Sequence, residues 1–244
     1  MRIDQFLVKS NICSRSEAKK IIKKGRVRVN DEVAGDPALH IDEKTDTVCL
    51  DGNAIVYEKY RYYMLNKPAG CVSATKDGLS ETVLECLKGE NTEDLFPVGR
   101  LDKDTRGLLL ITNDGKLAHN LLSPKHHVDK VYLAGVDDLL SDEECKRFAE
   151  GLDIGDDKNT LPAEICRDEG CTDESDFVTY RVTLREGRFH QVKRMFEALG
   201  RKVISLQRIA MGPVALDDKL AEGEYRKLTL AEIDALKCKV FLDK

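Results

Sequence analysis

The sequence predicts an α+β protein with two domains, and three observations lead to this prediction. Segments with period-two apolar alternation interleave with fewer segments of period 3.6 along most of the chain. The first 58 residues stand apart because they divide into a basic half and an acidic half. A chain of 244 residues is also long enough for one large and one small core. We therefore expect a small domain over residues 1–58, then a domain over residues 59–244 with a mixed, largely antiparallel sheet flanked by helices.

The composition is that of an ordinary globular protein, with 41% hydrophobic and 34% charged residues. No apolar run approaches the roughly 18 residues that a membrane span requires. The N-terminus has Asp4 and no apolar h-region, so we expect no signal peptide. The eight cysteines lack a C-x-x-C pair, which favours reduced thiols in a cytoplasmic protein over a metal site. They are Cys13, Cys49, Cys71, Cys86, Cys145, Cys166, Cys171 and Cys238.

Two short helices and a hairpin are predicted at the start of the chain. Ile3, Phe6 and Leu7 have the i, i+3, i+4 spacing of a helical stripe. The segment 14–17 (Ser-Arg-Ser-Glu) has the pattern of a capping box, and the helix that it opens ends at Gly25. The following strand and turn are carried by Val27, Val29 and Asn30-Asp31, and later strands by Ile41 and Val48–Leu50, with a turn at Asp51-Gly52.

Charge in the first domain is strongly polarised. Residues 1–30 carry nine bases and two acids, a local charge of +7, whereas residues 31–58 carry one base and eight acids, or −7. A solvated helix face would be the ordinary explanation of such lysines. The helix that ends at Gly25 nevertheless leads directly into a basic strand and has almost no acidic partners nearby, so we interpret this surface as a phosphate-binding face. Its candidate RNA-binding residues are Arg2, Arg15, Lys19, Lys20, Lys23, Arg26 and Arg28.

The second domain is predicted to begin after a linker at Asn53–Lys59. An apolar run at Tyr62–Leu65 indicates a strand, which ends at the loop Asn66-Lys67-Pro68-Ala69-Gly70. Alternation predicts strands again at 130–133 and 178–185, the latter with one basic face. A helix that buries Val192, Met195, Phe196 and Leu199 should then end at Gly200.

The densest polar motif is Gly99-Arg100-Leu101-Asp102-Lys103-Asp104-Thr105-Arg106-Gly107, directly before an apolar strand. Loops held at strand ends are frequent positions for catalytic groups. Two carboxylates at i and i+2 could simply form a turn through backbone amides. A phosphoryl-transfer loop of the D-x-D type is a second possibility. It fits less well, because no long apolar strand precedes Asp102 and Thr105 comes one position too early.

A third interpretation comes from a resemblance to known families. Arg2-Ile3-Asp4, Ser14-Arg15 with Ala18, and Gly25-Arg26-Val27 followed by Val29-Asn30 resemble the S4 RNA-binding module. Residues 99–110 resemble the catalytic loop of the pseudouridine synthases, and residues 65–70, 130–132 and 187–195 resemble three further segments of that superfamily. The resemblance covers nearly the whole chain. It implies a small αL-like S4 domain followed by a pseudouridine synthase catalytic domain.

The resemblance also implies roles for three residues. By position, Asp102 is the nucleophile, Tyr132 stacks on the target uracil, and Lys193 pairs with the aspartate, while Asp104 shapes the loop. A carboxylate can attack C1′ of uridine or stabilise the charge that develops there, and this chemistry calls for no metal and no organic cofactor. Alternatively, Lys193 pairs with Glu197 on a helix surface, and Tyr132 is a core tyrosine.

Further bases in the second domain are candidates for RNA contact. Arg100 and Arg106 flank the catalytic loop, and Arg188 and Arg194 lie in the segment 187–195. Additional candidates are Arg181, Arg185, Arg201, Lys202, Arg208 and the pair His126-His127. Two adjacent histidines are a poor metal site without further ligands, so we expect none.

The details of these motifs are similar to the RsuA branch of the family, because Phe189 and His190 stand where the large-subunit branch more often has asparagine and arginine. We therefore expect an enzyme that converts a uridine of 16S ribosomal RNA to pseudouridine. The alternatives are a 23S rRNA pseudouridine synthase and a non-catalytic RNA-binding ribosome-assembly factor. The expected partner is ribosomal RNA or a ribosome-assembly intermediate, not a membrane, and we expect a monomer.

Overall fold

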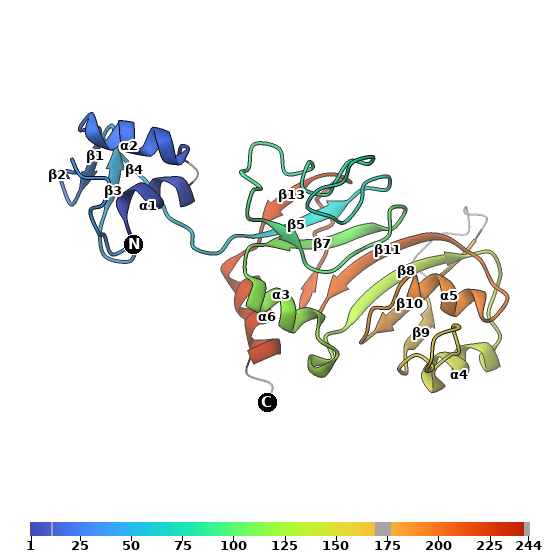
Figure 1. The fold of residues 1–244 in the computed structure, drawn as a ribbon. Helices are drawn as coiled ribbons and strands as arrows, with labels where there is room; N and C mark the ends of the chain where they lie inside the picture. The colour runs from blue at the N-terminus through green and yellow to red at the C-terminus, as the bar shows by residue number, and fades with distance from the viewer. Residues whose placement is uncertain (11, 169–176, 242–244) are drawn as a thin grey trace. The chain divides into compact units, whose positions relative to one another are not determined.

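The computed structural model describes residues 1–10, 12–168 and 177–241 of the chain, and these residues form two compact units. The first unit is Met1–Tyr60 and the second is Arg61–Lys244 (Figure 1). Within the described ranges, no helix has both the length and the apolar character that a bilayer crossing needs. The seven cysteines in these ranges are free thiols, and Cys171 lies outside them.

The first unit packs two helices on a small antiparallel sheet. Its elements are α1 (Ile3–Lys9), α2 (Arg15–Lys23), β1 (Val27–Val29), β2 (Glu32–Val33), β3 (Val48–Leu50) and β4 (Asn53–Ala54). The strands lie in the order β2-β1-β3-β4. The predicted stripe of Ile3, Phe6 and Leu7 is at most 2% exposed, and the core continues through Ala18 and Ile22. The two predicted helices are therefore confirmed.

Local sequence signals determine where these elements begin and end. The Ser14 hydroxyl accepts a hydrogen bond from the Glu17 amide, and the Glu17 carboxylate accepts one from the Ser14 amide, which is the predicted capping box. Gly25 has φ of 68°, the left-handed conformation that ends the helix. Asn30 and Asp31 also have positive φ, as a two-residue hairpin turn between β1 and β2 requires.

The predicted linker and one predicted strand were wrong. Asn53–Ala54 is a strand paired with β3, so the predicted linker Asn53–Lys59 begins too early. Ile55 and Tyr57 then pack against the core of the first unit. Ile41 is 5% exposed but lies outside any strand. The alternation of polar and apolar residues is short both around Ile41 and in Asn53–Lys59. Such a short pattern does not distinguish a paired strand from a loop that packs on the core.

The second unit contains a nine-stranded, mostly antiparallel sheet, as predicted. Its main path runs β13-β5-β7-β11-β8-β10-β9, and only the β7–β11 pair is parallel. The strands are β5 (Tyr62–Lys67), β6 (Phe96–Pro97), β7 (Arg106–Thr112), β8 (Lys130–Val136), β9 (Glu164–Arg167), β10 (Val178–Leu184), β11 (Val203–Met211), β12 (Val214–Ala215) and β13 (Tyr225–Lys227). The helices are α3 (Gly115–Leu122), η1 (Pro124–His126), α4 (Asp142–Glu150), α5 (Gln191–Glu197) and α6 (Leu230–Phe241).

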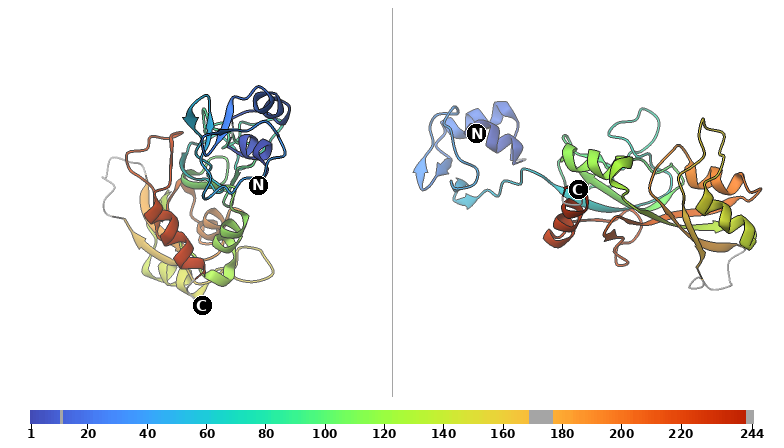
Figure 2. Two further views of the ribbon diagram at one scale, coloured as in Figure 1. Left: turned by 90° about the vertical axis from the view of Figure 1, so that its left-hand side faces the viewer. Right: turned by 90° about the horizontal axis from the view of Figure 1, so that it is seen from below.

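Helices cover both faces of this sheet, and a separate core lies on each face. One face packs against α4 and α5 through Phe148 and Phe196, the other against α3 and α6 through Leu121 and Leu236. The two helix pairs lie at different ends of the sheet (Figures 1 and 2). Because β5 and β7 meet a core on each face, both are apolar on successive residues instead of alternating.

Candidate active site

The loop between β6 and β7 carries the predicted nucleophile and is fixed at its start by a buried serine. The Ser73 hydroxyl accepts a hydrogen bond from the Leu101 amide at 3.0 Å and donates one to the Leu101 carbonyl at 2.8 Å. The Leu101 side chain is 6% exposed and belongs to the core beneath the loop. Backbone and side chain of the residue before Asp102 are therefore both immobilised.

A buried lysine fixes the other half of the loop. Lys67, the last residue of β5, is fully buried, and its ammonium donates hydrogen bonds to the carbonyls of Pro68, Lys103 and Thr105 at 3.0, 3.3 and 2.9 Å. Burial lowers the pKa of Lys67, because the charged form loses its hydration. The sequence motif contained Lys67 but gave no sign of this role, since Lys103 and Thr105 are 36 and 38 residues away in the chain.

Asp102 lies at the centre of the site, opposite two nitrogen groups from the segment around the start of α5. The Lys193 ammonium is 3.5 Å from Asp102 Oδ2, and His190 Nε2 is 3.5 Å from Asp102 Oδ1. The Asp102 side chain is 23% exposed, so it is sheltered yet open to a substrate. The structure therefore brings Asp102 and Lys193 together, as the sequence resemblance implied, and adds His190.

Lys193 also contacts the second carboxylate of the motif. Its ammonium is 2.6 Å from Asp104 Oδ1, closer than to Asp102, and this hydrogen bond lowers the pKa of Asp104. Asp104 is 73% exposed, whereas Asp102 is sheltered. The ion pairs of Lys193 are thus with the two aspartates and not with Glu197. Asp104 orients Lys193 from the solvent side.

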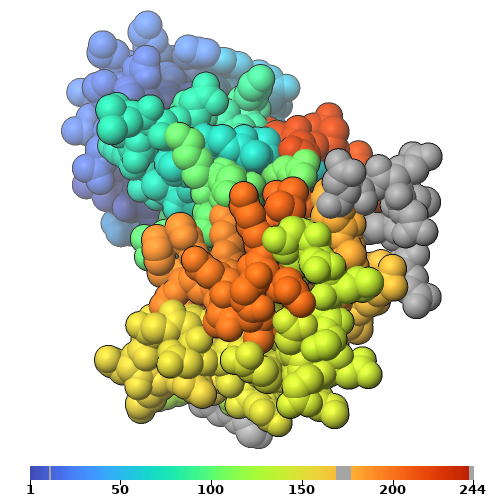
Figure 3. Space-filling view, turned by 90° about the vertical axis from the view of Figure 1, so that its right-hand side faces the viewer, coloured from blue at the N-terminus to red at the C-terminus, as the bar shows by residue number. Residues whose placement is uncertain are grey.

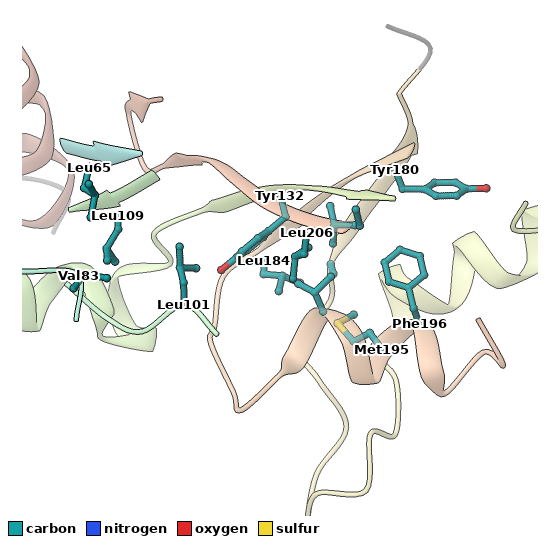
Figure 4. Close-up of a cluster of buried hydrophobic side chains, with 14 of the residues drawn as sticks. Leu65, Val83, Leu101, Leu109, Tyr132, Tyr180, Leu184, Met195, Phe196 and Leu206 are labelled. Atoms are coloured by element: carbon teal, nitrogen blue, oxygen red, sulfur yellow. The ribbon is translucent and has the colours of Figure 1, made fainter. Parts of the chain in front are cut away.

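Tyr132 is a buried tyrosine in the same core cluster as Leu101, the residue before Asp102. It is 9% exposed and stands on β8 opposite Val182 and Arg208. Its ring projects from the strand with the hydroxyl directed to the side where Leu101 lies (Figure 4). Tyr132 therefore belongs to the core and also lies near the residue that precedes Asp102.

Two buried cations near Tyr132, one on β8 and one on the neighbouring strand β11, were not expected. Lys130 is 5% exposed and donates to the Val128 carbonyl at 3.0 Å; burial, then the nearby Arg208 charge, lower the pKa of Lys130 to about 8. Arg208 is 2% exposed and donates to the Leu108 carbonyl at 2.8 Å. Arg208 was one of the predicted RNA contacts, and its burial argues against that role. The alternation along β8 correctly placed Lys130 and Tyr132 on one face of the strand. That face is the buried one, whereas Val131 and Leu133 on the other face are partly exposed.

The other basic residues of this unit are mostly engaged within the protein. Arg188 donates to Glu186, Asp156 and two backbone carbonyls, and Arg194 donates to Asp156 and to the carbonyls of Phe189 and Ile154. Several of these bonds join α5 and the turn before it to the loop between α4 and β9, and the two segments adjoin on the surface (orange and yellow in Figure 3). Further ion pairs involve Arg106 with Glu222, Arg181 with Asp168, Arg185 with Asp129 and Glu164, and Arg201 with Glu144. Arg100 is exposed.

The basic residues of the first unit divide into two groups. Arg2 pairs with Asp4, Arg26 pairs with Asp51, and Arg28 donates to the Asp31 carbonyl. The remaining predicted contacts lie on α2 or at its start; they are exposed and make no ion pair with a described residue. These are Arg15, Lys19, Lys20 and Lys23, together with Lys24.

Two family models match the chain, one within each compact unit. Residues 61–198 match the family model described as RNA pseudouridylate synthase, which is more than half of the chain. Residues 1–48 match the S4 domain model.

Full-length relatives lead to the same family. The chain is 42% identical over 237 residues to "Uncharacterized RNA pseudouridine synthase YtzG" of Bacillus subtilis, covering 97% of this chain and 98% of that protein. It is 38% identical to "Ribosomal small subunit pseudouridine synthase A" of Haemophilus influenzae, with 97% and 99% covered. A solved structure, "Crystal structure of pseudouridylate synthase", is 37% identical with a TM-score of 0.65, and the match covers 97% of this chain and 99% of that one. The chain therefore belongs to the RNA pseudouridylate synthase family and carries an N-terminal S4 domain.

Proposed function

We propose that this protein isomerises one uridine of small-subunit (16S) ribosomal RNA to pseudouridine, with Asp102 as the catalytic nucleophile. The observation that carries the proposal is the sheltered Asp102 carboxylate, 3.5 Å from both Lys193 and His190. The small-subunit assignment is supported by the name of the Haemophilus influenzae relative, which aligns over almost its full length.

The proposed chemistry follows from what each group can do. Isomerisation breaks the bond between C1′ and N1 and joins C1′ to C5 of the same base; C5 then loses its proton and N1 gains one, so the composition is unchanged. Asp102 would attack C1′ or stabilise the positive charge that develops there, as carboxylates do in glycoside hydrolysis. The Lys193 ammonium, 3.5 Å from Asp102 Oδ2, places a positive charge beside the carboxylate. Tyr132 would present a flat face to the uracil after it has left its stack. No step transfers electrons or needs a Lewis acid.

RNA binding is proposed for both units. The exposed bases of α2 make no ion pair with any residue that the structure describes, and such unpaired positive charge suits phosphate binding. Arg100 is exposed two residues before Asp102 and would contact the phosphates of the target nucleotide. Arg2, Arg26, Arg28, Arg106, Arg188 and Arg194 would add to this only by exchanging an intramolecular contact for a phosphate. We further propose that the protein is a cytoplasmic monomer that acts on rRNA or on a ribosome-assembly intermediate.

Tritium release tests the proposal. In the reaction C5 gives up its hydrogen, so RNA labelled with tritium at C5 of uridine releases label once per turnover. We expect release from small-subunit rRNA transcripts and not from large-subunit transcripts. Asp102→Asn should abolish release and leave RNA affinity within a few-fold, because the amide has the same shape but is not a nucleophile. Asp104→Asn is the matched control and should retain activity within about tenfold, because Lys193 can then pair with Asp102 alone.

Other outcomes would favour the alternatives. Release only from large-subunit transcripts would show a 23S rRNA enzyme. RNA binding without release from any rRNA or assembly intermediate would favour a non-catalytic assembly factor. Wild-type rates in Asp102→Asn would remove Asp102 from the mechanism.

A further inference from the structure

Two aromatic side chains at the turn before α5 form a stacked pair on the surface of the second unit. The Phe189 and His190 rings lie 3.7 Å apart between centroids, at an interplanar angle of 19°. Phe189 is nevertheless 74% exposed. The imidazole therefore covers one face of the phenyl ring and leaves the other face open to solvent.

The backbone beneath this pair is held firmly. The Arg188 amide donates to Gln191 Oε1 at 2.9 Å, and Gln191 Nε2 donates to Glu186 Oε1 at 2.8 Å. The Arg194 guanidinium donates to the Phe189 carbonyl at 3.2 Å. His190 has φ of 49°, a left-handed conformation that non-glycine residues seldom adopt. A large apolar ring is thus held in solvent by a braced and locally strained turn, although nothing in the core requires it there.

The pair leads directly to the reacting group. His190 Nε2 lies 3.5 Å from Asp102 Oδ1, while the same imidazole stacks on Phe189. Phe189, His190 and Asp102 therefore make a continuous series of contacts. We expect an RNA whose ribose C1′ reaches Asp102 to place one neighbouring nucleotide close to Phe189.

We propose that the open face of Phe189 is a stacking platform for a nucleobase next to the target uridine, and that His190 sets the spacing between that base and Asp102. The inference rests on the proposed function and identifies how its site holds a flipped-out target. Every nucleobase has a flat π-face, and proteins that hold unpaired RNA stack such bases on exposed aromatic rings. An aliphatic residue would offer apolar area without a flat face. The phenyl ring of Phe189 therefore indicates stacking on a base and not general apolar contact.

The first test compares three substitutions at one position by tritium release under limiting and saturating RNA. Phe189→Ala and Phe189→Leu should lower kcat/KM by about 5- to 100-fold, mainly through a higher KM, whereas Phe189→Tyr should stay within about threefold of wild type. Leu230→Ala removes another exposed apolar side chain, 80% exposed, far along the chain, and should change nothing. Because Phe189 is exposed, all four variants should unfold at the wild-type temperature.

The second test removes the base instead of the ring. Synthetic RNAs carry an abasic nucleotide at each position within two of the modified uridine. One abasic position should lower wild-type kcat/KM as much as Phe189→Ala does, and should have no further effect on Phe189→Ala itself.

Full activity of Phe189→Leu, or additive losses at every abasic position, would overturn the platform. Failure of the proposed function is distinguishable, because the wild-type protein would then release no tritium from intact RNA.

Discussion

The two units use basic residues in different ways. In the first unit, Lys19, Lys20 and Lys23 on α2 are exposed and make no ion pair with a described residue. In the second unit, Arg188 and Arg194 are bonded to carboxylates and carbonyls of neighbouring segments. The sequence shows positive charge in both places. Only the positions of the acids in three dimensions show that one group is available to phosphate and the other holds the site together.

The comparison distinguishes bases that should determine RNA affinity from bases that should stabilise the folded structure. Bases without acidic partners can release counterions when they bind RNA, so they should dominate the salt dependence of binding. Bases that are already paired must first lose a partner, and their removal should chiefly affect stability or the geometry around Asp102.

The largest effect on binding is expected from deleting residues 1–60. The second unit has two hydrophobic cores of its own and should remain folded. RNA affinity near physiological salt should fall by about 100-fold, while kcat at saturating RNA stays within a few-fold, because Asp102 and its partners are untouched. Circular dichroism and single-turnover kinetics would check this. An undiminished affinity would show that the first unit does not bind RNA.

A smaller loss is expected from Lys19→Gln, Lys20→Gln and Lys23→Gln combined. Each lost phosphate contact removes about 0.7 to 0.9 from the slope of log K against log salt, so the slope should become shallower by about 2 to 3. Arg26→Gln is the matched control, and its pairing with Asp51 predicts a smaller change. Equal slopes in the triple variant and the wild type would show that the lysines of α2 do not contact RNA phosphates and form an ordinary solvated helix face.

Arg188→Ala should leave the salt slope unchanged and lower the free energy of unfolding by about 2 to 3 kcal/mol, because the side chain is only 23% exposed and its removal leaves Glu186 and Asp156 with fewer partners. Urea unfolding would measure the loss. A stable variant with a shallower salt slope would instead make Arg188 an RNA contact.

Because Lys130 is buried, we expect the wild type and a Lys130→Met variant to differ in how their stability depends on pH. The pKa of Lys130 is lowered to about 8 in the folded protein from an ordinary 10.5, so between these values the unfolded state binds more protons. Stability should therefore rise with pH across this window, by about 2 kcal/mol from pH 7.5 to 9.5. Lys130→Met should remove that part of the rise. Parallel pH profiles of wild type and variant in urea unfolding would contradict the burial of the charge.

Local signals in the sequence predicted much of the fold. The Ser14 capping box, the Asn30-Asp31 turn and the apolar run of β5 each act over a few residues, and the structure contains all three. The loop that carries Asp102 was also recognisable, because Asp102 lies in a long motif with a specific resemblance. The contact of Asp102 with Lys193 followed from that resemblance and not from spacing.

Features that depend on distant partners were not predicted. Lys67 holds carbonyls more than 35 residues away, and Arg188 binds Asp156, which is 32 residues earlier in the chain. His190 lies in the segment 187–195 that resembles the family, yet only the fold brings it to Asp102. Apolar periodicity indicates which residues share one face of a helix or strand. It gives no information on which acidic residue of another element will pair with a given base.

The most direct test of the central claim is chemical mapping of pseudouridine in both ribosomal RNAs of cells whose only copy of the protein carries Asp102→Asn. Cells with the wild-type protein, with Asp104→Asn and with no protein complete the set. We expect one small-subunit pseudouridine to be absent in the Asp102→Asn and deletion cells and present in the other two. A small-subunit pattern in Asp102→Asn cells that is identical to wild type, or a loss confined to large-subunit RNA, would contradict the account.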